Sequence, residues 1–142
     1  MTDNGQQDGR ESSLDAGFRI RREVLGDAYV NAATQNATAF SRPLQELITE
    51  YCWGKVWSRP GLDRRTRSLL NIAMLTALNR QHELATHVRG AIRNSCTQEE
   101  ISEVILQAAV YCGAPAALEA SRTAQAALAA LNGATETSEA RA

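Results

Sequence analysis

Apolar side chains recur three and four positions apart along most of this chain, and no stretch has the alternating β-branched pattern of a strand. Alanine is abundant, and proline occurs only at positions 43, 60 and 115. Helices with an apolar face must bury that face against other elements, and here the only available elements are further helices. The sequence therefore predicts an all-helical fold.

About six helices are expected from capping residues at their starts and from glycine or asparagine at their ends. Asp63 is a suitable N-cap, and Thr97 followed by Glu100 forms a capping box. The third helix is apolar on nearly every side, so we expect it to be the buried centre. The expected helices span about residues 14–25 with a weaker stretch to 36, 43–57, 63–79, 81–93, 97–111 and 115–131.

The chain has 142 residues, of which 44% are hydrophobic, which is enough for one domain with a core but too short for two. We expect residues 13–131 to form that single domain. Residues 1–12 and 132–142 are rich in Gly, Ser, Thr and charge, so both are predicted to be disordered tails. Two long, largely apolar helices have more apolar surface than so small a domain can cover, which predicts a homo-oligomer.

The formal net charge is only −1, so the chain has no broad positive field to attract nucleic acid. The longest apolar run, Leu69 to Leu78, is too short to span a bilayer and is interrupted by Asn71 and Thr76. The first residues are polar and slightly acidic, unlike a secretory signal. We therefore expect a cytoplasmic protein without nucleic-acid or membrane partners.

The three cysteines, Cys52, Cys96 and Cys112, are far apart and odd in number. They form no CxxC pair, which argues against a disulfide framework, a zinc ribbon and thiol redox chemistry. We interpret them as small apolar residues in a reducing compartment.

The helix expected at residues 81–93 carries the most informative polar pattern. Arg80, Glu83 and His87 share one stripe beside its apolar face. Glu83 lies four residues before His87, so its carboxylate can hydrogen-bond the imidazole, fix its tautomer and raise its pKa. A histidine oriented by a carboxylate is sufficient to transfer one proton. The same spacing is also typical of an ordinary ion pair on a helix surface.

No metal site is expected on this helix. His82 and His87 are five residues apart, which turns them about 140° away from each other around the helix. A zincin motif needs two histidines four residues apart on one face, so metal binding is not predicted.

Arginines are concentrated around the third and fourth expected helices. Guanidinium groups suit a small di- or tricarboxylate, and Arg67 and Arg80 are the better-placed candidates. Arg89 lies about 200° around the helix from His87, so it would reach the same pocket only from a neighbouring subunit. The other arginines are interpreted as solvated charges or subunit salt bridges.

Trp53 and Trp57 are four residues apart and therefore share one side of a helix. Such a pair is more often part of a core than the wall of a pocket. The pair can also supply the apolar cover that a reacting carboxylate needs.

The chain contains four distinctive segments: RREVLGDAYV at residues 21–30, WGKVWSRPGLDRRTRSL at 53–69, ALNRQHELATHVRGA at 77–91 and TQEEISEVILQAAVYCGAPAA at 97–117. Together they resemble the carboxymuconolactone decarboxylase family over about residues 17–130. The resemblance implies the helical fold of alkyl hydroperoxidase D, assembled as a trimer or a hexamer. It also implies a carboxy-lyase that converts 4-carboxymuconolactone to 3-oxoadipate enol-lactone without a cofactor, in the β-ketoadipate pathway of aromatic breakdown.

Roles for individual residues are hypotheses at this point. His87 is expected to deliver a proton to the α-carbon of the product, and Glu83 to orient the imidazole. The substrate, a small carboxylated lactone, is expected to contact three arginines and two tryptophans, namely Arg67, Arg80, Arg89, Trp53 and Trp57.

Two further points come from the same resemblance. The peroxidase branch of the fold uses a CxxC and a following histidine, and aligning that histidine with His87 places Arg80 and Glu83 at the cysteine positions. A CxxC thiol peroxidase is therefore not expected. The chain also has Asn94-Ser95 where the family commonly has Asn-Gly, so the left-handed position of that turn is expected to shift to Asn94 or to be lost.

Two alternatives remain beside the lactone decarboxylase. The first is an enzyme of the same fold that acts by proton transfer on another small carboxylated lactone or enol. The second is a non-catalytic assembly or ligand-binding module, in which the stripe that carries His87 is only a subunit contact.

Overall fold

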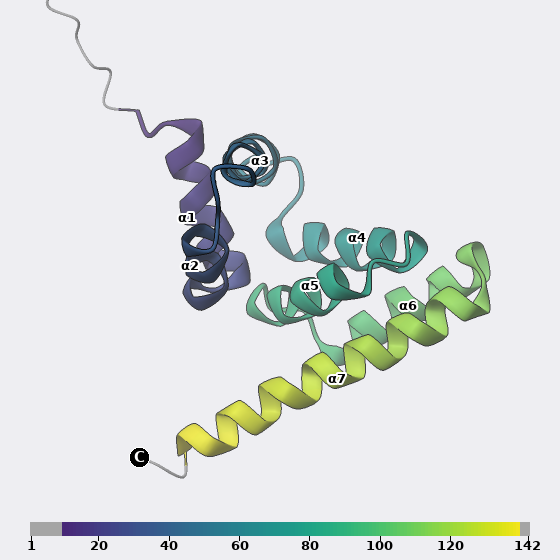
Figure 1. The fold of residues 1–142 in the computed structure, drawn as a ribbon. Coiled ribbons are helices and arrows are strands. Elements are labelled where there is room, and N and C mark those ends of the chain that lie inside the picture. Colours follow the sequence, from purple (N-terminus) through teal and green to yellow (C-terminus); the bar gives the residue numbers. More distant parts are fainter. Residues whose placement is uncertain (1–9, 140–142) are drawn as a thin grey trace, which may run out of the picture.

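The computed structural model describes residues 10–139, and every regular element among them is helical. Seven α-helices and one π-helix follow one another along this part of the chain (Figure 1). The all-helical prediction is confirmed. The elements are α1 (Ser13–Leu25), α2 (Asp27–Gln35), α3 (Arg42–Ile48), η1 (Thr49–Val56), α4 (Arg64–Ala77), α5 (Gln81–Arg93), α6 (Gln98–Cys112) and α7 (Ala114–Glu139).

The predicted helix starts are local features, and the structure confirms them. The Asp63 carboxylate accepts a hydrogen bond from the backbone N–H of Thr66 at 2.7 Å. The Thr97 hydroxyl accepts from the Glu100 N–H, and the Glu100 carboxylate accepts from the Thr97 N–H, which completes the capping box. These caps satisfy backbone donors that have no partner within their own helix.

Helix boundaries agree with the sequence expectation at the start of the chain and differ from it at the end. The stretch at 14–36 divides after Leu25 as expected, because Gly26 adopts a φ of 90° between the two helices. The last helix continues past residue 131 to Glu139, since residues 132–139 contain no proline to end it. These residues belong to the tail expected to be disordered, whereas residues 1–9 and 140–142 lie outside the described part.

The helix expected at 43–57 changes its hydrogen-bond pattern halfway. After α3, η1 forms a π-helix of eight residues, and the Trp57 N–H donates to the carbonyl of Cys52, five residues earlier, at 2.9 Å. Two glycines let η1 touch α1. A Cβ on Gly17 would lie 2.1 Å from the Thr49 carbonyl oxygen, and one on Gly54 would lie 2.0 Å from that of Ser13.

Two hydrophobic clusters form the core. The N-terminal cluster joins α1, α2 and η1 through Ile20, Val24, Leu25, Val30, Trp53 and Trp57. The C-terminal cluster joins α4, α5, α6 and α7, and α7 contributes a row of alanines that lets it pack closely. Helix α5 contacts α4 and α7 and also reaches α1 (Figure 1). It therefore links the two clusters.

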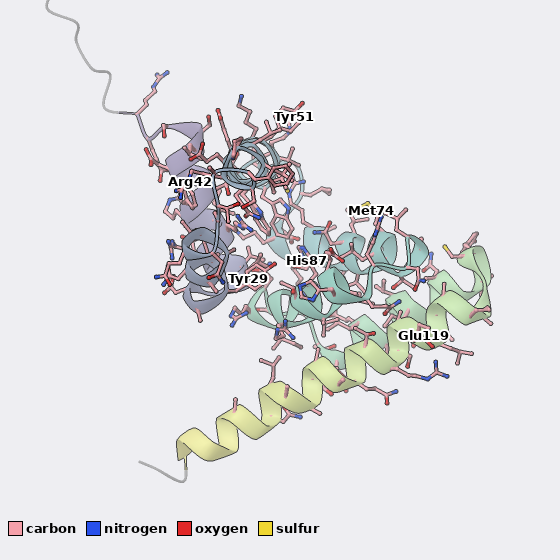
Figure 2. The ribbon with its side chains drawn as sticks, viewed as in Figure 1. Tyr29, Arg42, Tyr51, Met74, His87 and Glu119 are labelled. Atoms are coloured by element: carbon pink, nitrogen blue, oxygen red, sulfur yellow. The ribbon has the colours of Figure 1, made fainter. Side chains whose placement is uncertain are left out.

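The buried centre is α5 rather than the helix at 63–79, so that expectation is wrong. Leu84, Val88 and Ala91 of α5 are completely buried. Helix α4 instead exposes a row of apolar residues, and Figure 2 shows one of them, Met74, on its outer side. The exposed row continues on α6, where Val110 and Tyr111 are 80% and 81% exposed.

A groove of about 400 Å³ separates these exposed faces of α4 and α6. Its walls are mainly apolar, and they are formed by Thr66, Leu69, Leu70, Ala73, Val104, Gln107, Ala108, Tyr111 and Cys112. The single chain leaves this surface uncovered.

The turn between α5 and α6 keeps its left-handed position without glycine. Ser95 adopts a φ of 66°, whereas Asn94 stays at −85°. The expectation that this position moves to Asn94 or is lost is therefore wrong. Asn94 is held by its side chain, which donates to the Ser68 hydroxyl at 2.9 Å.

All three cysteines are free thiols. Cys96 is buried, Cys52 is half-buried and Cys112 is exposed. Of the three, Cys96 best fits the interpretation as a small apolar residue, because it alone is buried. Within residues 10–139, no helix combines the length and the apolar character that crossing a membrane requires.

Candidate active site

His87 lies on α5, near the middle of the molecule, where the two hydrophobic clusters meet (Figure 2). Its imidazole is parallel to the Trp53 indole, with 6.1 Å between ring centres, and Trp57 lies 6.5 Å away at 29°. The two indoles are 4.7 Å apart. The π-helix and the residue after it thus bring both tryptophans, which belong to the buried core, to one side of His87.

Burial decides the protonation state of His87. Enclosure by the protein lowers its pKa to about 4, and the negative charge of Glu83 opposes this only in part. The raised pKa expected from the sequence is wrong, because the desolvation of the ring outweighs the carboxylate. Without a ligand, the imidazole is therefore neutral at neutral pH.

The hydrogen-bond partner of His87 is Asn71 of α4 rather than Glu83. Asn71 Nδ2 lies 3.3 Å from His87 Nδ1. An amide nitrogen only donates, so with this orientation Nδ1 accepts and the proton of the neutral ring is on Nε2. Glu83 is exposed, and its effect on His87 is electrostatic.

The three arginines expected to hold the substrate lie in different surroundings. Arg67 on α4 is half-buried, its Nη2 donates to the Arg59 carbonyl at 3.2 Å, and its buried Nε has no partner. Arg80 is exposed at the start of α5. Arg89 Nη2 lies 3.5 Å from the Thr86 hydroxyl. Of the three, only Arg67 has a buried side-chain donor without a partner among the described residues.

An open cleft of about 450 Å³ lies beside Trp57, between the end of η1 and the start of α4. Arg19 and Arg64 on its rim pair with Glu23, at 3.5 and 2.5 Å. The side chain of Arg59 forms no ion pair with any described residue. Trp57 both lines this cleft and faces His87, whereas His87 itself is not part of the lining. Its lining residues are Arg19, Ile20, Trp57, Ser58, Arg59, Pro60, Leu62, Asp63 and Arg64.

No group of three or more His, Cys, Asp and Glu side chains within the described part is arranged to hold a metal ion. The five-residue spacing of His82 and His87 likewise predicts no pair of histidine ligands on α5.

Sequence reasoning missed Asn71 as a site residue. The signal was a single amide in an otherwise apolar run, which looked only like an interruption of that run. A polar side chain on a buried helix face needs a partner, and here the partner is sixteen residues away on the next helix.

Comparison with known proteins identifies the family of the chain. Residues 42–136 match the carboxymuconolactone decarboxylase family, from α3 to near the end of α7. The chain belongs to this family.

Two named relatives match most of the chain. The nitrosuccinic acid decarboxylase npaB of Metarhizium robertsii is 53% identical over 107 residues, which is 75% of each chain. The 4-carboxymuconolactone decarboxylase of Acinetobacter baylyi is 43% identical over 115 residues, 81% of this chain and 86% of the relative. An uncharacterised 15.0 kDa protein of Paracoccus denitrificans is 37% identical over 80 residues, 55% of this chain and 60% of the relative.

Proposed function

We propose that this protein decarboxylates a small acid with at least two carboxylates, in which the departing carboxylate is next to an electron-accepting group. The observation that carries the proposal is His87, an enclosed imidazole with its ring proton on Nε2, fixed between two indoles and Asn71. Family membership and the names of both characterised relatives support the same reaction type.

The reaction needs a group that accepts one electron pair and a donor of one proton. The C–C bond to the carboxylate breaks, CO2 leaves, and the pair stays on the carbon that held it. A nitro group accepts this pair directly as a nitronate, and a ring double bond passes it to the carbonyl of an unsaturated lactone. Protonation of carbon then completes the product.

His87 is assigned as the proton donor. A neutral imidazole is a poor acid, but a dianionic substrate beside it favours the imidazolium form and raises its pKa. In the protonated ring both nitrogens carry a proton, so Nδ1 becomes a donor and the Asn71 amide presents its oxygen instead of its nitrogen. The ring then gives its Nε2 proton to the carbon and becomes neutral, the charge state that burial favours. Water restores the proton before the next turnover.

Nitrosuccinate is the first substrate candidate, because the nitrosuccinic acid decarboxylase is 53% identical to this chain. Loss of the carboxylate from the nitro-bearing carbon would give 3-nitropropanoate. The second candidate is 4-carboxymuconolactone, because the match to that decarboxylase covers 81% of this chain. Both candidates have a second carboxylate that stays on the product, so both need a cationic contact.

The test is an assay of the purified protein with each acid in turn, following release of CO2 together with the ultraviolet loss of the unsaturated lactone or the appearance of 3-nitropropanoate. We expect a higher kcat/KM for nitrosuccinate. His87→Gln should lower turnover by about 10² or more, whereas His82→Gln, on the exposed side of the same helix, should keep it. Turnover of neither acid by the wild type would contradict the proposal.

We also propose that the chain forms a homo-oligomer through α4 and α6. Exposed apolar side chains line both helices and the groove between them, and monomeric proteins rarely leave so large a contiguous apolar patch in water. A second copy would present the same patch, since symmetric assembly pairs identical surfaces. This exposed set is Leu70, Met74, Leu78, Leu106, Val110 and Tyr111.

A further inference from the structure

Arg21 on α1 is a second cation near the candidate site, and it is buried. The residue is only 6% exposed. Its Nη1 donates to the Thr49 hydroxyl at 2.9 Å and to the Gln45 amide oxygen at 3.1 Å. Its buried Nε has no partner. Within residues 10–139, no carboxylate forms an ion pair with it. The guanidinium therefore has only neutral partners.

A buried charge without a counter-ion is costly. Desolvation lowers the pKa of Arg21, and the Tyr29 phenol and the Cys52 thiol oppose this only in part. Burial also raises the pKa of Cys52, so the thiol is neutral and supplies no compensating charge. Proteins that bury a cation normally pair it with an anion. The described residues supply no such anion to Arg21.

One of the side chains that enclose Arg21, Gln45, comes from an exposed helix. Gln45 belongs to α3, a helix of seven residues in which no residue is buried. Its amide oxygen holds the position on Nη1 that a carboxylate oxygen would take. Thr49 does not depend on the arginine, since its hydroxyl also donates to the Gln45 carbonyl at 2.7 Å. Displacing the Gln45 side chain would open the guanidinium to a ligand and leave Thr49 satisfied.

Arg21 and His87 flank the same turn of η1. The Cys52 side chain faces Arg21, and the next residue, Trp53, stacks against His87. Helix α1 also crosses α5 where Val24 meets Gly90, because a Cβ on Gly90 would lie 3.2 Å from the Val24 carbonyl.

Each of the two functional residues is therefore one helical turn from this crossing. With a turn rising about 5 Å and helix axes up to about 10 Å apart, their backbones lie within about 14 Å. An arginine side chain and a bound four-carbon diacid together can span that distance.

We propose that Arg21 binds the carboxylate that the product retains, while the departing carboxylate lies beside His87. This inference rests on the proposed function and assigns a substrate contact on α1. It also predicts the length of the preferred acid, because one end must reach under α3 and the other must reach the imidazole.

The test uses succinate, a four-carbon dicarboxylate that lacks an electron-accepting group and so does not react. Calorimetry should show that the wild type binds succinate and that Arg21→Met weakens binding by about tenfold or more. Arg21→Lys keeps the charge and should retain part of the affinity. Arg22→Met, at the next position of α1, is the matched control and should bind as the wild type does.

Thermal unfolding without ligand separates this role from a structural one. Because Met is similar in length and uncharged, Arg21→Met should unfold at the same or a higher temperature than the wild type. A lower unfolding temperature with unchanged succinate binding would overturn the inference, and so would a wild type that does not bind succinate. A change in the mass of Arg21→Met in solution would assign the residue to a subunit contact instead. If the wild type binds succinate through Arg21 but decarboxylates neither acid, the proposed function fails while the carboxylate site stands.

Discussion

The ring planes of the His87 imidazole and the Trp53 indole are almost parallel, with an angle of 2° between them. The two residues come from helices that pack into different hydrophobic clusters. The contact joins η1 of the N-terminal cluster to α5 of the C-terminal cluster. The candidate site therefore exists only while the two clusters are docked, and the environment of His87 reports on that docking.

Replacing Asn71 should change the acid–base behaviour of His87. Asn71→Asp puts a carboxylate beside Nδ1 in place of the amide, which favours the imidazolium form and should raise the pKa of His87 by about one unit or more. If the protonated ring is the active form, kcat/KM declines above about pH 4 in the wild type, and the variant should extend its active range to higher pH.

The measurements are kcat/KM against pH and the 15N shifts of the imidazole. Asn31→Asp, on the exposed surface of α2, adds the same charge far from His87 and serves as the control. An Asn71→Asp profile equal to that of the wild type would show that Asn71 does not set the state of the ring.

Stability should depend on His87 in weakly acidic solution. The folded-state pKa of about 4 lies below the ordinary value of 6.5, so the unfolded chain binds more protons between these two pH values. The contribution of His87 to the free energy of unfolding is therefore fully present above about pH 6.5. It is lost as the pH approaches 4, which lowers that free energy by up to about 3 kcal/mol. Denaturant unfolding at several pH values measures this, and His87→Gln should lose that part of the dependence while His82→Gln keeps it.

Gly17→Ala should destabilise the fold strongly. A methyl group there would lie 2.1 Å from the Thr49 carbonyl oxygen, so α1 and η1 would have to separate. We expect a loss of about 3 kcal/mol or more in the free energy of unfolding. Gly61→Ala, with no atom within 4 Å of its new methyl group, is the control. Equal stability of the two variants would show that the close approach of these helices is not needed.

Val110→Asp should reduce the mass of the protein in solution. The side chain is 80% exposed on α6 in the single chain, and a charge at that position would oppose burial against a second copy. Light scattering after size-exclusion chromatography measures the mass. Ser102→Asp adds the same charge to an exposed polar position of α6 and should leave the mass unchanged. A monomeric wild type would refute the assembly.

Local features were predictable from sequence, and features that depend on distant packing were not. The capping box at Thr97 and the cap at Asp63 need only residues three positions apart, so their pattern is visible in the chain. The expectation of a raised pKa for His87 was wrong. The sequence shows Glu83 one helical turn away, but it does not show that Trp53 and Trp57 of another element enclose the ring.

The arginines show the same difference between features that are local in sequence and features that depend on distant packing. Arg67 was a candidate by its place on a largely apolar helix, and its free Nε supports that role. Arg21 was not among the candidate arginines, because nothing nearby in sequence shows that α3 and η1 bury it. Only the folded chain distinguishes a guanidinium that lacks a counter-ion from one in water.

The π-helix also sets a limit on changes in chain length. Each turn of η1 closes its hydrogen bonds over five residues rather than four, so it holds residues that an α-helix of the same span would not accommodate. Deletion of a single residue between Thr49 and Val56 would let the segment revert to α-helical bonding, and the residues within the segment, Trp53 included, would then face other sides of the helix. Trp53 would then lose its stacking on His87 even though every residue of the site remained in the sequence. Among relatives of this chain, a one-residue gap in η1 would therefore mark a change of site as clearly as the loss of the histidine.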